Sequence, residues 1–318
     1  MTTSFLDKKI YIAGHNGMVG SSLVKRLLSS GHKNLLVAGR EHVDLTIQED
    51  VNLFIKANSP KVVVICAAKV GGILANNTYR GQFLYNNLQI ATNIIQASHE
   101  NSVEKLIFLG SSCIYPKECK QPIKEEYLLT SSLEHTNEPY AIAKIAGLKM
   151  CESYYQEYGD NFYSVMPCNL FGENDNFDLK TSHVLPALIR KAHEAKIKNK
   201  DYIEVWGSGT PLREFLHTHD LSRALEMCIN SINAKDIYDQ GISHLNIGSD
   251  DEVTIKELTE IICKVVGFDG EIKFDNTKPD GTMRKKMDNS RIKKLNFKQE
   301  LSLEEGLKKV YESERKKW

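Results

Sequence analysis

Short apolar runs alternate with longer amphipathic stretches over the first two thirds of this chain, and this alternation limits the possible folds more than any other feature. The apolar runs predict strands at residues 9–13, 35–38, 62–67, 105–110 and 163–166. The stretches between them have helical periodicity, at residues 18–30, 47–58, 81–100 and 141–158. Buried strands separated by helices form a parallel sheet that is covered on both faces. We therefore predict an α/β fold with a doubly wound parallel sheet.

A glycine-rich loop follows the first predicted strand and opens the first predicted helix. The G-x-x-G-x-x-G spacing lets the backbone turn tightly and approach a pyrophosphate, which lies against the free N–H groups of the helix N-terminus. A loop in this position is typical of a Rossmann sheet that binds a dinucleotide. The expected cofactor contacts in the loop are Gly14, Asn16, Gly17, Met18, Val19 and Gly20.

The regularity of the chain weakens after residue 169. A helix is predicted at 184–198, a strand at 203–206, a helix at 221–230, a strand at 245–248 and a helix at 255–266, followed by a Lys-rich tail. We expect residues 1–168 to form the Rossmann domain, completed by about 213–248. Residues 169–212 and 249–318 are expected to form a smaller, mixed α/β domain that binds the substrate.

The end of the second predicted strand indicates which dinucleotide is bound. An acid at this position binds the ribose hydroxyls of NAD, whereas an arginine accepts the 2′-phosphate of NADP. The strand ends in Ala38-Gly39-Arg40, although Glu41 follows at once and could serve NAD instead. We predict that the cofactor is NADP(H), bound in part by Arg40.

Charge and cysteine content exclude several classes of function. The 41 Lys and Arg residues balance the 41 Asp and Glu residues, so no net basic field attracts nucleic acid or an anionic membrane. No apolar run approaches the roughly 20 residues of a membrane span, and no signal peptide precedes the first strand. The seven cysteines include no C-x-x-C pair. We expect a cytoplasmic protein with small-molecule partners and no metal.

A tyrosine and a lysine indicate proton-transfer chemistry. Tyr140 and Lys144 are four residues apart in a predicted helix and therefore share one face. The ammonium is expected to lower the pKa of the phenol, so that the pair can exchange a proton with a substrate oxygen. The hydroxyl-rich turn from Ser111 to Pro116 leaves the fourth strand at the sheet edge where ligands bind.

These motifs together resemble the GDP-L-fucose synthase family of extended short-chain dehydrogenases. The resemblance extends essentially from Lys9 to the last helix, and the Ala67–Ile73 segment is especially close to this family. The matching segments are the glycine loop, Ser111–Pro116, Asn137–Lys144, Met166–Leu170, Trp206–Phe215 and Lys278–Thr282. One departure is Asn16, where bacterial members often carry an arginine that helps hold the 2′-phosphate.

The resemblance implies a bifunctional 3,5-epimerase and NADPH-dependent 4-reductase of a GDP-4-keto-6-deoxy sugar. It assigns hydride transfer to Ser111, Tyr140 and Lys144, and the acid/base work of epimerisation to Cys113 and His183. It implies a homodimer formed through the helices at 81–100 and 141–158. Further cofactor contacts are implied for Leu109, Lys144, Pro167, Asn169, Leu170 and His183, and substrate contacts for Lys191, Trp206, Arg213 and Asp280.

Other functions must be weighed against this one. A 4,6-dehydratase of the same superfamily should carry an Asp-Glu pair where this chain has Ser112-Cys113. A 4-epimerase should keep NAD bound rather than consume NADPH. A C4 reductase of a related GDP-4-keto sugar, such as a 6-deoxyheptose, would differ in only a few pocket side chains. A cofactor-sensing regulator without chemistry would not need Ser111, Tyr140 and Lys144 together.

The stretch from His217 to Asp220 suggests a metal site at first sight. It lacks the helical spacing of two histidines that zinc proteases use, and no third ligand is recognisable in the sequence. We interpret the stretch as structural.

Overall fold

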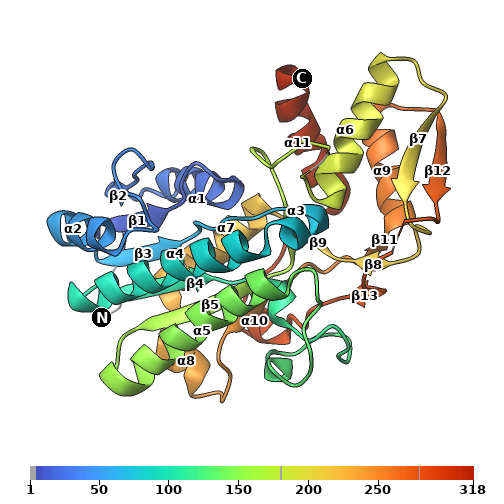
Figure 1. The fold of residues 1–318 in the computed structure, drawn as a ribbon. Coiled ribbons are helices and arrows are strands. Elements are labelled where there is room, and N and C mark those ends of the chain that lie inside the picture. Colours follow the sequence, from blue (N-terminus) through green and yellow to red (C-terminus); the bar gives the residue numbers. More distant parts are fainter. Residues whose placement is uncertain (1–4, 180, 279) are drawn as a thin grey trace.

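The computed structural model describes residues 5–179, 181–278 and 280–318, so Pro279 of the Lys278–Thr282 segment lies outside the described residues. The principal strands are β1 (Ile10–Ala13), β2 (Leu35–Leu36), β3 (Val62–Ile65), β4 (Lys105–Leu109), β5 (Phe162–Pro167) and β10 (Leu245–Ile247). They form one parallel sheet in the order β10-β5-β4-β3-β1-β2 (Figure 1). The predicted parallel sheet is confirmed.

Helices cover both faces of this sheet. They are α1 (Met18–Ser29), α2 (Gln48–Asn58), α4 (Arg80–Glu100), α5 (Glu138–Tyr158) and α7 (Thr218–Ser231). Side chains alternate along a strand, so Ile10 and Ile12 of β1 pack in a core with α1 and α7, whereas Tyr11 packs in a second core with α2 and α4. The doubly wound arrangement follows from strands that are apolar on both faces.

A third core lies at the other end of the molecule, at the upper right of Figure 1. It is built by α6 (Val184–Ile197), β7 (Tyr202–Trp206), α9 (Ile255–Val266), β12 (Glu271–Asp275) and α11 (Leu303–Glu314). β12 pairs in parallel with β7. Within the Lys-rich tail, α11 begins with a reciprocal cap between Ser302 and Glu305, a pattern that marks the start of a helix.

Short elements connect these cores, and most carry no periodicity that a sequence argument could detect. They are α3 (Ile73–Thr78), β6 (Asn169–Phe171), β8 (Leu212–Arg213), β9 (Phe215–His217), α8 (Ala234–Tyr238), β11 (Val253–Thr254), β13 (Arg284–Lys285), α10 (Ser290–Lys294) and the 3-10 turns Ser112–Ile114, Glu125–Tyr127 and Arg315–Lys317. β8 pairs with both β11 and β13, and β6 pairs with β9. Among the described residues, no helix is long and apolar enough to cross a membrane.

Candidate active site

The glycine loop at the start of α1 has the shape that a pyrophosphate requires. Gly14 has φ +88°, and a Cβ there would come within 2.7 Å of the Ala67 backbone. A Cβ on Gly20 would lie 2.2 Å from the Gly14 carbonyl oxygen, so helix and loop can approach only without side chains. No side chain caps the helix at Gly17, which leaves its first N–H groups available to an anion. The loop therefore fits a dinucleotide.

Arg40 and Glu41, which follow β2, are arranged differently. The Arg40 side chain is 80% exposed, and its guanidinium donates two hydrogen bonds to Asp44 Oδ2, at 3.0 and 2.7 Å. Glu41 turns back over Gly39, where a Cβ would lie 2.3 Å from either carboxylate oxygen, and its Oε1 lies 2.9 Å from His42 Nδ1. Arg40 is thus a surface cation, and its guanidinium can bind a phosphate if it releases its hydrogen bonds to Asp44.

Tyr140 and Lys144 project from α5 towards the end of β4. Lys144 is 4% exposed, its Nζ donates to the Leu109 carbonyl at 2.7 Å, and burial lowers its pKa to about 8. Burial also raises the pKa of Tyr140, an effect that the nearby Cys113 increases and a hydrogen bond with Ser111 opposes. The expectation that Lys144 lowers the pKa of Tyr140 is wrong for this state, because desolvation dominates and Lys144 is engaged with a backbone carbonyl.

Cys113 lies in the 3-10 turn that follows Ser111, whose Oγ accepts a hydrogen bond from the Cys113 N–H at 3.4 Å. Burial raises the pKa of the thiol, while the charge of Lys285, the hydrogen bond with Ser111 and the charge of Lys144 act in the opposite direction. Burial likewise lowers the pKa of Lys285. Lys285 is a site residue that the sequence analysis missed, since it lies between two other basic residues in an apparently ordinary basic run.

Tyr115 anchors the turn that carries Ser111 and Cys113. Its buried hydroxyl lies 2.6 Å from His244 Nε2 and donates to Asn246 Oδ1 at 2.5 Å. His244 directly precedes β10 and Asn246 lies within it. The turn is therefore fixed to the edge strand of the sheet as well as to β4.

His183 is the residue immediately before α6, as predicted from the sequence. Its side chain is accessible to solvent, yet enough protein surrounds it to lower its pKa through desolvation. The segment before it is held by Gly72, whose N–H donates to the Thr181 carbonyl at 2.9 Å. His183 thus lies at the end of a loop that contacts the segment following β3.

The four predicted substrate residues gather around β7, β8 and the segment before β13. Lys191 Nζ lies 5.6 Å from the centroid of the Trp206 ring and donates to the Glu204 carbonyl at 2.9 Å. Asp280 accepts hydrogen bonds from the N–H and the hydroxyl of Ser208, at 2.7 and 2.9 Å. Burial lowers the pKa of Arg213, and the charge of Asp280 opposes this shift.

The pairing of the short strands β8 and β13 links the substrate residue Arg213 to the thiol of Cys113 through Lys285. Arg213 lies opposite Lys285 in the β8–β13 register, and Lys285 interacts electrostatically with both Arg213 and Cys113. A line of polar groups therefore connects the exposed Trp206 region with the sheet edge.

The remaining predicted cofactor residues lie at or just beyond the carboxyl ends of β4 and β5. Leu109 ends β4, Pro167 ends β5, and Asn169 and Leu170 begin β6. Asn169 Nδ2 donates to the Glu214 carbonyl at 3.0 Å, which fixes this turn to the β8–β9 junction. These residues lie at the carboxyl edge of the sheet, where the glycine loop also begins.

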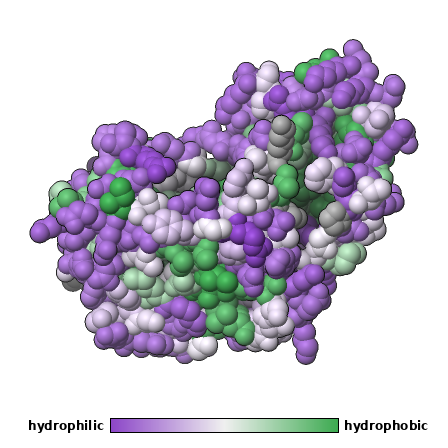
Figure 2. Space-filling view, in the orientation of Figure 1, coloured by the Kyte–Doolittle hydropathy of each residue, from purple (hydrophilic) through white to green (hydrophobic). Residues whose placement is uncertain are grey.

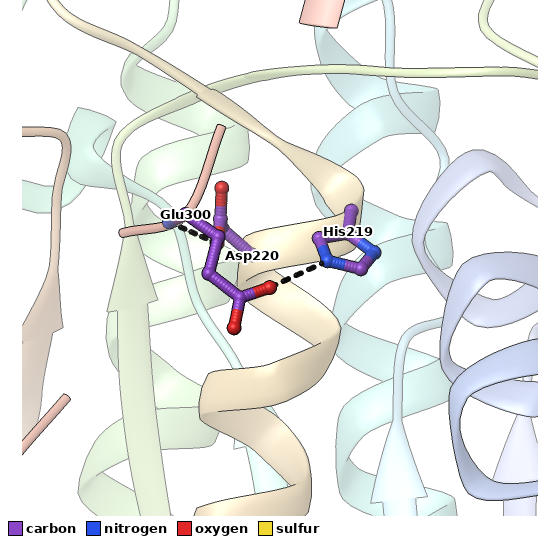
Figure 3. A group of neighbouring side chains, drawn as sticks. All are labelled: His219, Asp220 and Glu300. Atoms are coloured by element: carbon purple, nitrogen blue, oxygen red, sulfur yellow. Dashed lines mark hydrogen bonds and ion pairs between the residues drawn. The ribbon is translucent and has the colours of Figure 1, made fainter. Parts of the chain in front are cut away.

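His219, Asp220 and Glu300 form a group whose possible ligand atoms lie within 4.8 Å of one another (Figure 3). Asp220 is fully buried and accepts hydrogen bonds from the N–H groups of Glu300 and Leu301, at 2.8 and 3.1 Å, and from Arg223 at 3.1 Å. His219 Nε2 lies 3.1 Å from Glu300 Oε2. The carboxylate of Asp220 thus ties α7 to the loop before α11, and Glu300 supplies the third possible ligand that was not recognisable in the sequence.

A dinucleotide loop on a doubly wound sheet, with Ser, Tyr and Lys at its carboxyl edge, defines the short-chain dehydrogenase class. Residues 10–248 match the model of the NAD dependent epimerase/dehydratase family, and the chain belongs to this family. A GDP-L-fucose synthase of Sinorhizobium fredii is 52% identical over 306 residues, covering 96% of this chain and 95% of that protein.

Solved structures agree over nearly the whole length. A GDP-6-OMe-4-keto-L-xylo-heptose reductase from C. jejuni superposes with a TM-score of 0.92 and is 37% identical, covering 98% of this chain and 99% of that one. A GDP-L-fucose synthetase from Naegleria fowleri bound to NADP has a TM-score of 0.87 and is 27% identical, covering 98% and 94% of the two chains.

Proposed function

We propose that this protein is a GDP-L-fucose synthase, which epimerises a GDP-4-keto-6-deoxy sugar at C3 and C5 and then reduces the C4 ketone. The observation that carries the proposal is the convergence of Ser111, Cys113, Tyr140 and Lys144 on one turn at the sheet edge, in a chain 52% identical to an enzyme of that name. The molecule is an NADP-dependent oxidoreductase and epimerase of the extended short-chain dehydrogenase type.

The cofactor is NADP(H), as the sequence predicted and as the NADP-bound relative supports. The glycine loop would hold its pyrophosphate, and Arg40 would meet its 2′-phosphate. When bound, the reduced cofactor supplies a hydride to C4 of the sugar. Leu109, Lys144, Pro167, Asn169, Leu170 and His183 are proposed to complete its binding site.

Epimerisation needs a base and an acid on opposite faces of the sugar ring. The C4 ketone acidifies the protons at C3 and C5, so a base can remove one to give an enolate, and an acid can return it on the other face. We assign this pair to Cys113 and His183. Lys285 and Lys144 would favour the thiolate form of Cys113 that a base requires.

Reduction needs a proton at O4. Because the pKa of Tyr140 is raised, its hydroxyl remains protonated near neutral pH and can donate that proton. Ser111, which is hydrogen-bonded with Tyr140, would hold the same oxygen and stabilise negative charge on it during both chemistries. Each epimerisation leaves the composition of the sugar unchanged, and reduction adds one hydride and one proton.

The nucleotide end of the substrate is assigned to the residues around β7 and β8. Trp206 is 57% exposed and can stack on a base, with Lys191 beside it. Arg213 and Lys285 would meet the diphosphate, and Asp280, held by Ser208, would contact ribose. We propose that residues 1–168 and 213–248 form the Rossmann domain, and that residues 169–212 and 249–318 form the substrate domain. The short strands β8, β9 and β13 connect the two domains.

The face formed by α4 and α5 would be buried in a homodimer. Hydrophobic residues gather in this region of the surface in Figure 2, and the exposed apolar side chains of the two helices include Tyr85, Ile142 and Tyr158, at 60, 44 and 52% exposure. A patch of this kind is typical of an association surface.

Separating the two chemistries by mutation tests the proposal. In deuterated water with NADP⁺ in place of NADPH, the wild-type protein should exchange deuterium into C3 and C5 of GDP-4-keto-6-deoxymannose. Cys113→Ser should abolish this exchange, because a hydroxyl is a much poorer base than a thiolate. With NADPH, the mutant should still reduce the unepimerised ketone, which NMR of the product would reveal.

Two outcomes would contradict the proposal. If Cys113→Ser and His183→Asn both give the inverted product at the wild-type rate, the pair is not catalytic. If the wild type reduces the ketone without exchange or inversion, the protein is a plain C4 reductase. A panel that includes a GDP-4-keto-6-deoxyheptose then identifies its substrate.

A further inference from the structure

The segment between β3 and α3 contacts both the cofactor loop and the histidine loop. At its first end, Ala67 packs so closely on Gly14 that a Cβ on Gly14 would come within 3.1 Å of the Ala67 Cβ. At its other end, the Gly72 N–H donates to the Thr181 carbonyl at 2.9 Å. One short stretch of backbone therefore spans from the glycine loop to the residues that precede His183.

The contact at Gly72 leaves no room for a side chain. A Cβ there would lie 2.6 Å from the Ser182 carbonyl oxygen and 3.3 Å from the Thr181 carbonyl oxygen, and both atoms belong to the backbone. Gly72 has φ −66°, which any L-residue can adopt. Close approach to the backbone at Thr181 and Ser182, rather than an unusual backbone conformation, is therefore what requires glycine at this position.

Buried amides hold both ends of this short stretch on α3 and α4. The Asn76 side chain donates to the Gly72 carbonyl at 3.1 Å, and the Asn76 backbone N–H donates to the same oxygen at 3.0 Å. Asn87 on α4 accepts from the Lys69 N–H at 2.9 Å and donates to the Lys69 carbonyl at 3.0 Å. Because the stretch is fixed in this way, it can hold a loop that packs on it.

We propose that Gly72 is a positioning residue for His183: its close backbone contact with Thr181 and Ser182 sets the place of the imidazole relative to the cofactor loop. The inference rests on the proposed role of His183 as an acid/base group. A displacement of about 1 Å in such a group can cost roughly 10²-fold in rate. Hydride transfer, which is assigned to Ser111, Tyr140 and Lys144, should be much less sensitive.

The test is Gly72→Ala, compared with two alanine variants of nearby glycines. A Cβ on Gly71 would contact the side chains of Ala75 and Phe83, at 2.9 and 3.2 Å, and not the histidine loop, whereas a Cβ on Gly81 would meet nothing within 4 Å. The first readout is deuterium exchange at C3 and C5 with NADP⁺ bound. We expect it to fall roughly 10²-fold in Gly72→Ala, by far less in Gly71→Ala, and not at all in Gly81→Ala.

A second readout does not depend on activity. The imidazole Cε1–H resonance of His183, assigned by its loss in His183→Asn, should shift in Gly72→Ala and stay in place in Gly81→Ala. Reduction of an already epimerised ketone at saturating NADPH should remain within a few fold of wild type. If Gly72→Ala fails to fold, Asn76→Ala removes the amide that holds the Gly72 carbonyl, and the exchange rate and the resonance should change in the same direction.

The outcomes separate the two hypotheses. An unmoved His183 resonance in Gly72→Ala, or equal losses of exchange in Gly71→Ala and Gly72→Ala, overturns the positioning role. Equal losses of exchange and of reduction in Gly72→Ala overturn it too, because the effect is then general. Absence of exchange in the wild type overturns the proposed function, whereas the resonance still reports whether Gly72 places His183.

Discussion

The cofactor side and the substrate side of this molecule are built in different ways. The pyrophosphate loop of the cofactor side uses contiguous sequence: Gly14 to Gly20 forms one turn, and the residues that shape it are its own glycines and Ala67, which packs on it. The substrate side gathers single residues from α6, β7, β8 and the segment around β13, which are widely separated in the chain. A site built from contiguous residues can be recognised in the sequence as a motif. A site built from dispersed residues can be recognised only in the folded structure.

The two sides also differ in what holds them in place. The glycine loop lies between β1, a buried strand of four residues that is paired on both sides, and α1, a helix of twelve residues. The two-residue strands β8 and β13 instead depend on Glu214, which is 1% exposed and accepts hydrogen bonds from the N–H groups of Met287 and Ser249, at 2.7 and 3.0 Å. Substrate-side geometry therefore depends on a buried carboxylate, and cofactor-side geometry on backbone shape.

The largest expected effect is at Tyr140, which lies where the two sides meet. Tyr140→Phe removes the proton donor and leaves the packing of the ring intact, so the rate of ketone reduction should fall by roughly 10²–10⁴-fold. Binding of NADPH and of the GDP-sugar should be nearly unchanged. The measurement is the steady-state rate of NADPH oxidation, together with separate binding titrations. Tyr155→Phe, on the same helix, is the control and should retain the wild-type rate.

A smaller effect is expected on the cofactor side alone. Arg40→Asp replaces the cation that would meet the 2′-phosphate by a like charge, and a hydrogen bond to a charged group contributes about 1.5–3 kcal/mol. NADPH affinity should therefore fall roughly 10- to 100-fold, since 1.4 kcal/mol is tenfold. NADH affinity and GDP-sugar affinity should change little. Equal losses for NADPH and NADH, measured by fluorescence titration, would remove the role of Arg40 in cofactor choice.

The last expected effect is on stability and not on activity, and it concerns pH and the substrate side. Burial raises the pKa of Glu214 to about 7 from an ordinary value of 4.5, so the folded protein binds a proton there more tightly than the unfolded chain does. The resulting contribution to the free energy of unfolding is fully present below pH 4.5 and is lost as pH rises to about 7. It amounts to at most about 3 kcal/mol. Glu214→Gln should flatten this slope in unfolding midpoints measured between pH 5 and 8. The exposed Glu312→Gln should leave the slope as in the wild type.

The sheet could be predicted because its strands are apolar on both faces and lie between long helices. The pairing of β10 with β5 could not be worked out from local pattern, because Leu245 and Val165 are partners across an 80-residue separation. The strands β8, β11 and β13 have two residues each. Alternation needs more residues than that to be recognised, so their formation depends on tertiary contacts.

The site residues divide in the same way. Ser111, Tyr140 and Lys144 were found through spacing and resemblance, and the structure brings them together at the end of β4. Lys285 was missed because its neighbours Arg284 and Lys286 have the same charge. In the structure Arg284 pairs with Glu252 and Lys286 donates to the Ser249 carbonyl, whereas Lys285 interacts with Cys113. Successive side chains of a strand point to opposite faces, and only this alternation distinguishes Lys285 from Arg284 and Lys286.

The sheet order has a consequence for a chain that is still being synthesised. β5 is an interior strand only once β10 has paired with it, and β10 follows it by nearly eighty residues. Until those residues have left the ribosome, the backbone of Phe162–Pro167 is an unpaired edge with buried-type side chains such as Tyr163 and Val165. Such an edge invites pairing with other chains. The sheet order therefore leaves one edge of β5 without its partner for the whole period between the emergence of β5 and that of β10.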